Sequence, residues 1–192
     1  MTFPPVVLRL PDWVGEMTSG GVFQTLEDQM AFVVSLARRN VAEGTGGPFA
    51  SAVFEIESGR LVAPGVNLVV PSSAAIAHAE VTAIAVAGQV CGGFDLGGSD
   101  RPPMALVAST EPCAMCFGAV PWSGVRRLVC GARDEDARAI GFDEGPKLLD
   151  WPQALAERGI EVVRDVMRAE ARRVLEDYAA AGGVIYNGRL GD

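Results

Sequence analysis

The chain has 192 residues, a formal net charge of −8 and 49% hydrophobic residues. This length favours one domain, which can bury roughly 70% of the surface that the unfolded chain exposes, and no apolar run approaches the ~20 residues of a membrane span. The acidic charge disfavours a nucleic-acid partner, because binding to phosphates requires a basic surface and the basic residues cluster only at Arg38 with Arg39 and Arg126 with Arg127.

Residues 1–23 show no sustained periodicity, and we expect them to form an irregular leader. This segment lacks the basic region followed by an apolar run that marks a signal peptide, so we expect a cytoplasmic protein. Four cysteines do not make a disulfide framework in a chain of this size. A reducing compartment would keep them as thiols that can bind metal.

Helical periodicity begins at Thr25, which resembles a helix cap together with Asp28. The spacing of the apolar residues that follow predicts a helix over residues 25–42. Two strands, over residues 49–56 and 61–70, are expected next, and a tight turn joins them.

The rest of the chain alternates between helical and extended patterns. A helix is expected over residues 74–87, and a buried strand over 104–109 leads into a helix that begins at Pro112. Further strands are expected over 125–132 and 160–163, and further helices over 134–140 and 165–180. This alternation predicts a single layered α/β domain with a mixed sheet.

Two short motifs contain residues that bind metal in other proteins: His78-Ala79-Glu80, and Glu-Pro-Cys-Ala-Met-Cys over residues 111–116. The thiols of Cys113 and Cys116 lie where a helix is expected to start, and a helix N-terminus favours thiolates. His78 is the only histidine. Together the three side chains form a zinc ligand set that leaves the fourth position to water. We therefore predict one Zn²⁺ per chain.

Glu80 lies two residues after the histidine, where its carboxylate can reach the open position without binding the metal. There it can take a proton from water and return it to a leaving group. His-x-Glu combined with Pro-Cys-x-x-Cys is the signature of the zinc deaminases. An alternative is a structural zinc site closed by Cys91 or Cys130, which would make the protein a non-catalytic binding module.

The chain resembles the cytidine deaminase superfamily, and within it the bacterial guanine deaminases with the cytidine-deaminase-like fold. Besides the zinc motifs, the resemblance rests on Asn67 and on four segments: Gly-Pro-Phe-Ala at 47–50, residues 113–125, Ala-Ile-Gly-Phe-Asp-Glu-Gly-Pro at 139–146, and Gly-Val-Ile-Tyr-Asn at 183–187. It implies a three-layer α/β/α fold with a central mixed sheet of about five strands.

The resemblance also implies a reaction of purine metabolism, the hydrolytic deamination of guanine to xanthine and ammonia. Zinc-activated water would attack C2 of the base, with Glu80 as one catalytic carboxyl. Glu144 would be the second, orienting the substrate amine and protonating it as ammonia leaves. The implied substrate-binding residues are Asn67, Ala79, Phe49, Trp122, Phe142, Asp143 and Tyr186.

A homodimer is implied as well, in which the C-terminal tail over residues 182–192 closes an active site, either its own or that of the neighbouring subunit. The zinc motifs themselves do not select the base. The same chemistry on cytosine, a nucleoside, an amino-triazine such as ammeline, or adenosine in tRNA therefore remains an alternative. The acidic charge argues against tRNA.

Overall fold

The computed structural model describes residues 2–18 and 21–189. Within them, one mixed sheet has the strand order β2-β1-β3-β4-β5. Its strands are β1 (Ala50–Glu55), β2 (Leu61–Val66), β3 (Met104–Thr110), β4 (Arg127–Ala132) and β5 (Glu161–Val163). Strand β1 is antiparallel to both of its neighbours, whereas β3, β4 and β5 are parallel. The predicted mixed sheet of five strands is confirmed.

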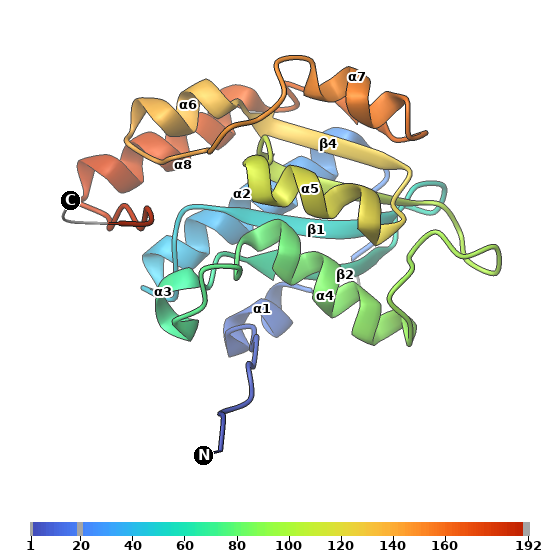
Figure 1. Ribbon diagram of the computed structural model, residues 1–192, viewed down its shortest axis with the longest axis horizontal. Coiled ribbons are helices and arrows are strands. Elements are labelled where there is room, and N and C mark those ends of the chain that lie inside the picture. The colour runs from blue at the N-terminus through green and yellow to red at the C-terminus, as the bar shows by residue number, and fades with distance from the viewer. Residues whose placement is uncertain (1, 19–20, 190–192) are drawn as a thin grey trace.

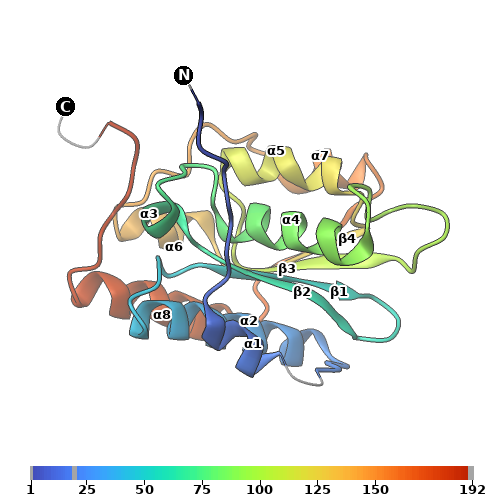
Figure 2. The same ribbon diagram turned by 90° about the horizontal axis from the view of Figure 1, so that it is seen from below.

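Helices cover both faces of the sheet (Figures 1 and 2). On one face lie α4 (Ala79–Cys91), α5 (Ala114–Ser123) and α7 (Trp151–Ala156), and on the other lie α1 (Asp12–Met17), α2 (Leu26–Ala42) and α8 (Arg168–Ala180). Two short helices, α3 (Val69–Ser72) and α6 (Asp134–Ala139), follow β2 and β4. The three-layer α/β/α architecture is therefore confirmed. No helix of the described residues is long and apolar enough to cross a membrane.

The sheet separates two hydrophobic clusters, one beneath each layer of helices. Phe54 belongs to the cluster that contains Met30 and Leu36 of α2, whereas its neighbour Val53 belongs to the cluster that contains Ala83 of α4. All seven residues of β3 are buried. A central strand that is covered on both faces reads as a continuous apolar run, which is why β3 was recognisable from the sequence.

The structure differs from the predicted elements at several places. The leader is not wholly irregular, because residues 12–17 form α1 and bury Trp13 and Val14. The second strand ends at Val66, four residues before its predicted end. Helix α4 begins at Ala79 rather than near residue 74, because His78 is extended and forms the N-cap. Short helices such as α1 and α3 contain too few turns to show a 3.6-residue period.

The topology brings several chain ends to one edge of the sheet. Strand β3 ends at Thr110 and α5 begins at Ala114, while α4 begins at Ala79 on the same side of the sheet. In open α/β sheets, ligands bind outside the carboxyl ends of the parallel strands. The candidate site lies at this edge.

Candidate active site

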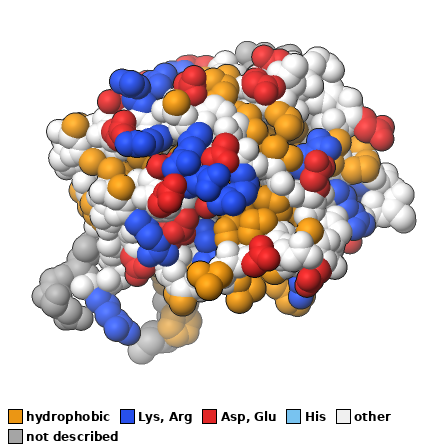
Figure 3. Space-filling view, turned by 90° about the horizontal axis from the view of Figure 1, so that it is seen from above, with side chains coloured by type: hydrophobic (Ala, Val, Ile, Leu, Met, Phe, Trp, Pro, Cys, Tyr) orange, Lys and Arg blue, Asp and Glu red, His pale blue; other side chains and the backbone are white. Residues whose placement is uncertain are grey.

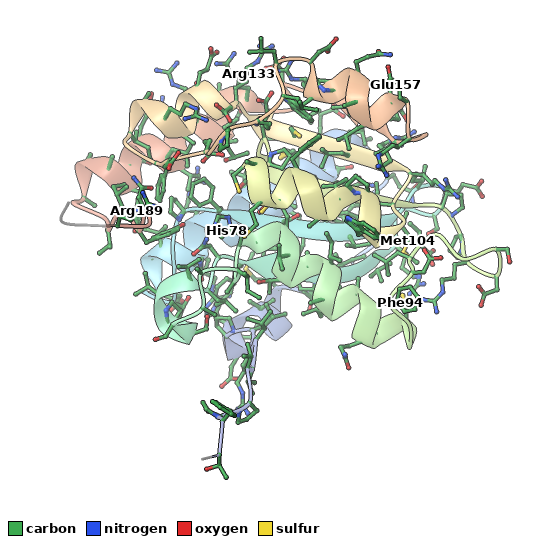
Figure 4. The ribbon with its side chains drawn as sticks, viewed as in Figure 1. His78, Phe94, Met104, Arg133, Glu157 and Arg189 are labelled. Carbon is green, nitrogen blue, oxygen red and sulfur yellow. The ribbon has the colours of Figure 1, made fainter. Side chains whose placement is uncertain are left out.

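Three possible zinc ligands come from the starts of two helices. His78 is the N-cap residue of α4, Cys113 is the N-cap residue of α5, and Cys116 lies in the first turn of α5. Figure 4 shows His78 at the start of α4. One ligand atom from each of the three residues lies within 4.8 Å of the others. Within the described residues, neither Cys91 nor Cys130 joins this group.

The distances within the group fit a tetrahedral zinc ion. The Sγ of Cys113 lies 3.6 Å from the Nδ1 of His78. Tetrahedral bonds of ~2.05 Å to nitrogen and ~2.3 Å to sulfur place the two ligand atoms about 3.6 Å apart. The donor set, one imidazole and two thiols, is also the one that zinc prefers. The residues present therefore fit the predicted metal.

The two thiols share a buried environment at the N-terminus of α5. The thiol of Cys116 and the imidazole of His78 lower the pKa of Cys113 to about 4. The Cys113 thiolate, followed by burial, raises the pKa of Cys116 well above the usual range of a thiol. Cys113 is thus the thiol of the pair that loses its proton more readily, and the thiolate is the form that binds a metal.

Glu80 lies in the first turn of α4 and lines the same cavity as His78 and Cys113. Its side chain is buried, and burial, followed by the charge of Cys113, raises the pKa of its carboxyl. The carboxyl is not part of the ligand group. A buried carboxyl with a raised pKa beside a metal can accept and return a proton near neutral pH.

The cavity has a volume of about 180 Å³, and side chains from six segments line it. Asn67, at the end of β2, is almost fully buried and faces the cavity. Its Oδ1 accepts a hydrogen bond from the backbone N–H of Val69, at 3.3 Å. The Nδ2 of Asn67 has no partner among the described residues. A buried donor without a partner costs free energy, so this amide is suited to a ligand acceptor.

Glu144 is the second buried carboxyl of the cavity. Burial, followed by the charges of Cys113 and Glu80, raises its pKa to about 8. The backbone carbonyl of Glu144 accepts a hydrogen bond from the N–H of Ala114, at 2.8 Å. This bond holds the loop over residues 141–147 against the start of α5, beside the zinc ligands.

Lys147 fixes the other end of this loop. Its Nζ donates to the carbonyl of Pro112 at 2.8 Å and lies 2.9 Å from the Oδ1 of Asp134. The ammonium group also lies 5.1 Å from the centre of the Trp151 ring. The loop that contains Glu144 is therefore attached on both sides of Cys113.

The C-terminal tail covers the loop. The Oδ1 of Asn187 accepts a hydrogen bond from the N–H of Asp143, and its Nδ2 donates to the carbonyl of Gly141, both at 2.9 Å. The ring of Phe142 packs between those of Phe49 and Tyr186, at centroid distances of 4.9 and 5.0 Å. Aromatic rings therefore form an apolar wall opposite the polar groups.

The model of the cytidine and deoxycytidylate deaminase zinc-binding region matches residues 24–132 of the chain. The protein belongs to this deaminase family. The match begins just before α2 and ends with β4, so it contains Glu80 and the three residues that could bind zinc. The cavity groups Glu144 and Tyr186 lie beyond it.

One curated relative and two solved structures show which deaminases this chain is similar to. The guanine deaminase of Bacillus subtilis is 39% identical over 111 residues, which cover 58% of this chain and 67% of that protein. A solved structure of the guanine deaminase from Nitrosomonas europaea is 43% identical, with a TM-score of 0.88 over 93% of this chain and 100% of the other. Another structure, in complex with 2,6-diaminopurine, is 46% identical, with a TM-score of 0.90 over 96% and 98% of the two chains.

The deaminase fold brings most of the predicted site residues together. The cavity is lined by Phe49, Asn67, His78, Glu80, Cys113, Phe142, Asp143, Glu144 and Tyr186. Ala79 is fully buried between the two motif residues but does not line the cavity. Trp122, in contrast, is 86% exposed at the end of α5 and does not line it either.

Asn187 and Lys147 were not among the predicted site residues. Asn187 bonds to backbone groups 44 and 46 positions earlier in the chain, and Lys147 to a carbonyl 35 positions earlier. Bonds of this kind leave no pattern in a single sequence. The available signal was the Tyr-Asn pair in the tail, which indicated the segment but not the role of its asparagine.

Proposed function

We propose that this deaminase uses zinc to convert guanine and water into xanthine and ammonia. The observation that carries the proposal is the position of Glu144, a second buried carboxyl that shares the cavity with Glu80, His78 and Cys113. One carboxyl can serve the attacking water while the other serves the leaving amine. The similarity to guanine deaminases along nearly the whole chain supports this substrate.

His78, Cys113 and Cys116 would hold one Zn²⁺ per chain. Bound there, zinc would lower the pKa of water enough to supply a nucleophile at neutral pH. Glu80 takes a proton from the water as the water oxygen bonds to C2 of guanine, and passes it to N3 as the C2–N3 double bond opens. Glu144 holds the exocyclic amine and donates a proton to it. The bond between C2 and this amine then breaks and ammonia leaves, while the hydroxyl at C2 becomes the carbonyl of xanthine and returns its proton to Glu144.

The rest of the cavity would select a purine base. The Nδ2 of Asn67 is a free donor for a carbonyl or ring nitrogen of the base. Phe49 and Phe142 supply an apolar wall, and Tyr186 closes the cavity from the tail. We assign substrate binding to these residues and to Asp143. Trp122 could take part only if its exposed side chain reaches the cavity of a neighbouring subunit. Ala79 could take part only through its backbone.

We also place the enzyme in purine metabolism in the cytoplasm, as a homodimer. Large apolar side chains support the homodimer, since Phe94, Trp122 and Leu149 are all more than 85% exposed. A nucleic-acid substrate is disfavoured. On the face shown in Figure 3, Lys and Arg side chains lie among Asp and Glu, and Arg133, Arg138 and Arg168 all pair with carboxylates.

The direct test is an ultraviolet assay that follows the loss of guanine and the formation of xanthine. Guanine should react in preference to cytosine, adenosine, guanosine and ammeline. The Glu80→Ala variant should retain its zinc and lose at least about 100-fold in kcat, the lower range for removal of a general acid/base. Faster turnover of another base would reassign the substrate, and normal turnover by Glu80→Ala would remove Glu80 from the mechanism.

A further inference from the structure

A partly buried chain of hydrogen bonds connects the leader to the residue after β2. The Nε1 of Trp13 in α1 donates to the Oγ1 of Thr45 at 3.1 Å, and this hydroxyl donates to the Oδ1 of Asn40 at 2.8 Å. The Nδ2 of Asn40 donates to two carbonyls, those of Gly47 at 2.9 Å and Asn67 at 3.0 Å. We call the side chains of Trp13, Asn40 and Thr45 the Asn40 hub.

The hub holds the backbone of two cavity walls. Asn40 is fully buried, and all of its side-chain polar atoms have partners. One carbonyl partner belongs to Gly47, two residues before Phe49 and just ahead of β1. The other belongs to Asn67, which follows the end of β2. These two walls are also joined directly, because the N–H of Asn67 donates to the carbonyl of Phe49 at 3.0 Å.

The fit around the hub is tight. A Cβ added at Gly46 would lie 1.9 Å from the carbonyl oxygen of Asn67 and 2.6 Å from the Nδ2 of Asn40. A Cβ added at Gly47 would lie 2.3 Å from the Oη of Tyr186, on the other side of the same loop. The backbone can approach the two walls this closely only because both residues are glycine.

The leader is attached firmly enough to act on this hub. Arg39 of α2 lies over the Trp13 ring at 5.2 Å and pairs with Glu16 of α1 at 2.7 Å. Figure 2 shows α1 beside α2, in the layer opposite α4 and α5. The hub therefore reaches the cavity from the far side of the sheet, without touching the zinc ligands.

We infer that Asn40, Thr45 and Trp13 are positioning residues for base recognition, which hold the backbone of Asn67 so that its free Nδ2 faces an acceptor atom of the nucleobase. The inference rests on the proposed function and deepens it. It gives the leader a role in substrate binding, although none of its described residues lines the cavity. The proton transfers of the deamination reaction are carried out by Glu80 and Glu144.

The test is the nearly isosteric variant Thr45→Val, which removes the hydroxyl between Trp13 and Asn40. The variant loses the hydrogen bonds of this hydroxyl to Trp13 and to Asn40. The KM for guanine should rise at least about fivefold, the factor that one ordinary hydrogen bond contributes, while kcat and bound zinc stay at wild-type values. Affinity measured by titration of guanine into the inactive Glu80→Ala background should fall by the same factor. That titration is needed because KM equals the dissociation constant only when chemistry is slow.

Thr25→Val is the matched control. Thr25 caps the other end of α2, where its Oγ1 accepts a hydrogen bond from the N–H of Asp28 at 3.0 Å, so its loss lowers stability without touching the cavity. A rise in KM in Thr45→Val but not in Thr25→Val supports the hub. An equal rise in both, or an unchanged KM in Thr45→Val, overturns it.

Trp13→Phe provides a second measurement should Thr45→Val fold poorly. It keeps an aromatic ring beside Arg39 and removes the N–H donor together with the five-membered ring of the indole. KM should again rise with kcat unchanged, and a fall in kcat alone would contradict a positioning role. The proposed function fails separately: if wild-type protein does not deaminate guanine, the same variants are compared on whichever base the panel identifies.

Discussion

At the scale of single residues, the cavity gathers groups that burial makes unfavourable. Glu80 and Glu144 both line it, and burial is the largest cause of the raised pKa of both carboxyls. A buried acid that prefers to stay protonated makes the folded state less stable above its ordinary pKa. The groups that suit the reaction are therefore ones that weaken the fold.

Glu144→Gln should reveal this effect in metal-free protein. The pKa of Glu144 rises from an ordinary 4.5 to about 8 on folding, so the folded wild type binds one proton more than the unfolded chain between these values. Its stability therefore falls as pH rises through this window, by up to about 1.4 kcal/mol per unit. Glutamine has no proton to lose in this range, so the stability of the Glu144→Gln variant does not fall for this reason.

Denaturant unfolding in chelator, from pH 4 to 9, measures the difference. The stability advantage of Glu144→Gln should grow between pH 4.5 and 8 and stay level above it. Glu57→Gln, which changes an exposed carboxylate in the β1–β2 turn, serves as the control and should follow the wild type. Parallel curves for Glu144→Gln and wild type would show that Glu144 titrates normally.

Residues that act through short motifs were predictable, and residues that act through distant contacts were not. His78 and Glu80 lie at the start of one helix, and Cys113 and Cys116 lie at the start of another. Helix geometry therefore places the two residues of each pair close together. Trp122 followed the zinc motif in sequence, but the helix carries it to the exposed end of α5. The sequence of a helix does not state which of its ends faces the cavity.

At the scale of elements, the tail and the loop over residues 141–147 act as one unit. Asn187 bonds to the backbone of Gly141 and Asp143. Nearer to α8, the Oη of Tyr178 donates to the carbonyl of Val184 at 2.7 Å, and the N–H of Gly183 donates to the carbonyl of Tyr178 at 2.9 Å. The tail is thus fixed at both ends of its path.

Asn187→Ala should release the far end of this path. Losing two hydrogen bonds of about 1 kcal/mol each should raise the KM for guanine by about 10- to 30-fold, with a smaller change in zinc content. Steady-state kinetics and metal analysis measure the two effects. Val184→Ala keeps the backbone carbonyl that Tyr178 uses and should behave as wild type. A wild-type KM in Asn187→Ala would mean that the tail stays closed without this bond.

Long elements were predicted well, because periodicity needs several turns or a buried run to become visible. Helix α2 was predicted within one residue of each end, and its cap at Thr25 is confirmed. Helix α7 was not predicted, since its six residues show hardly two turns of pattern. The same holds for α1, whose burial depends on α2 rather than on its own sequence.

At the scale of the whole molecule, the proposed zinc ligands lie on two different helices, so a metal bound to them would join α4 to α5. Helix α4 packs mainly on β1 and β2, and α5 begins where β3 ends. A metal bound to both N-caps therefore adds a link across the middle of one helical layer. Binding to the folded state alone stabilises it in proportion to the logarithm of metal concentration over dissociation constant.

Removal of the metal should lower the melting temperature. A thousandfold excess over the dissociation constant corresponds to about 4 kcal/mol, or roughly 8 to 16 °C for a chain of this size. Calorimetry before and after chelation, followed by addition of Zn²⁺, measures the change. Cys116→Ser should show a smaller shift on chelation. Identical melting curves with and without chelator would argue that the site adds nothing to the fold.

The two hydrogen bonds between the side chain of Asn187 and the backbone of Gly141 and Asp143 have a consequence for engineering. The zinc ligands and Glu80 all precede residue 117, whereas Glu144, Phe142 and Tyr186 follow residue 140. Because the tail is bonded to the loop that it covers, these two late segments can be transplanted together between homologues as a single cassette. Chimeras with a junction in the β4–α6 connection would then exchange the contribution of Glu144, Phe142 and Tyr186 to base preference. Asn67, Phe49 and the proposed hydrolytic residues would stay with the first part of the chain.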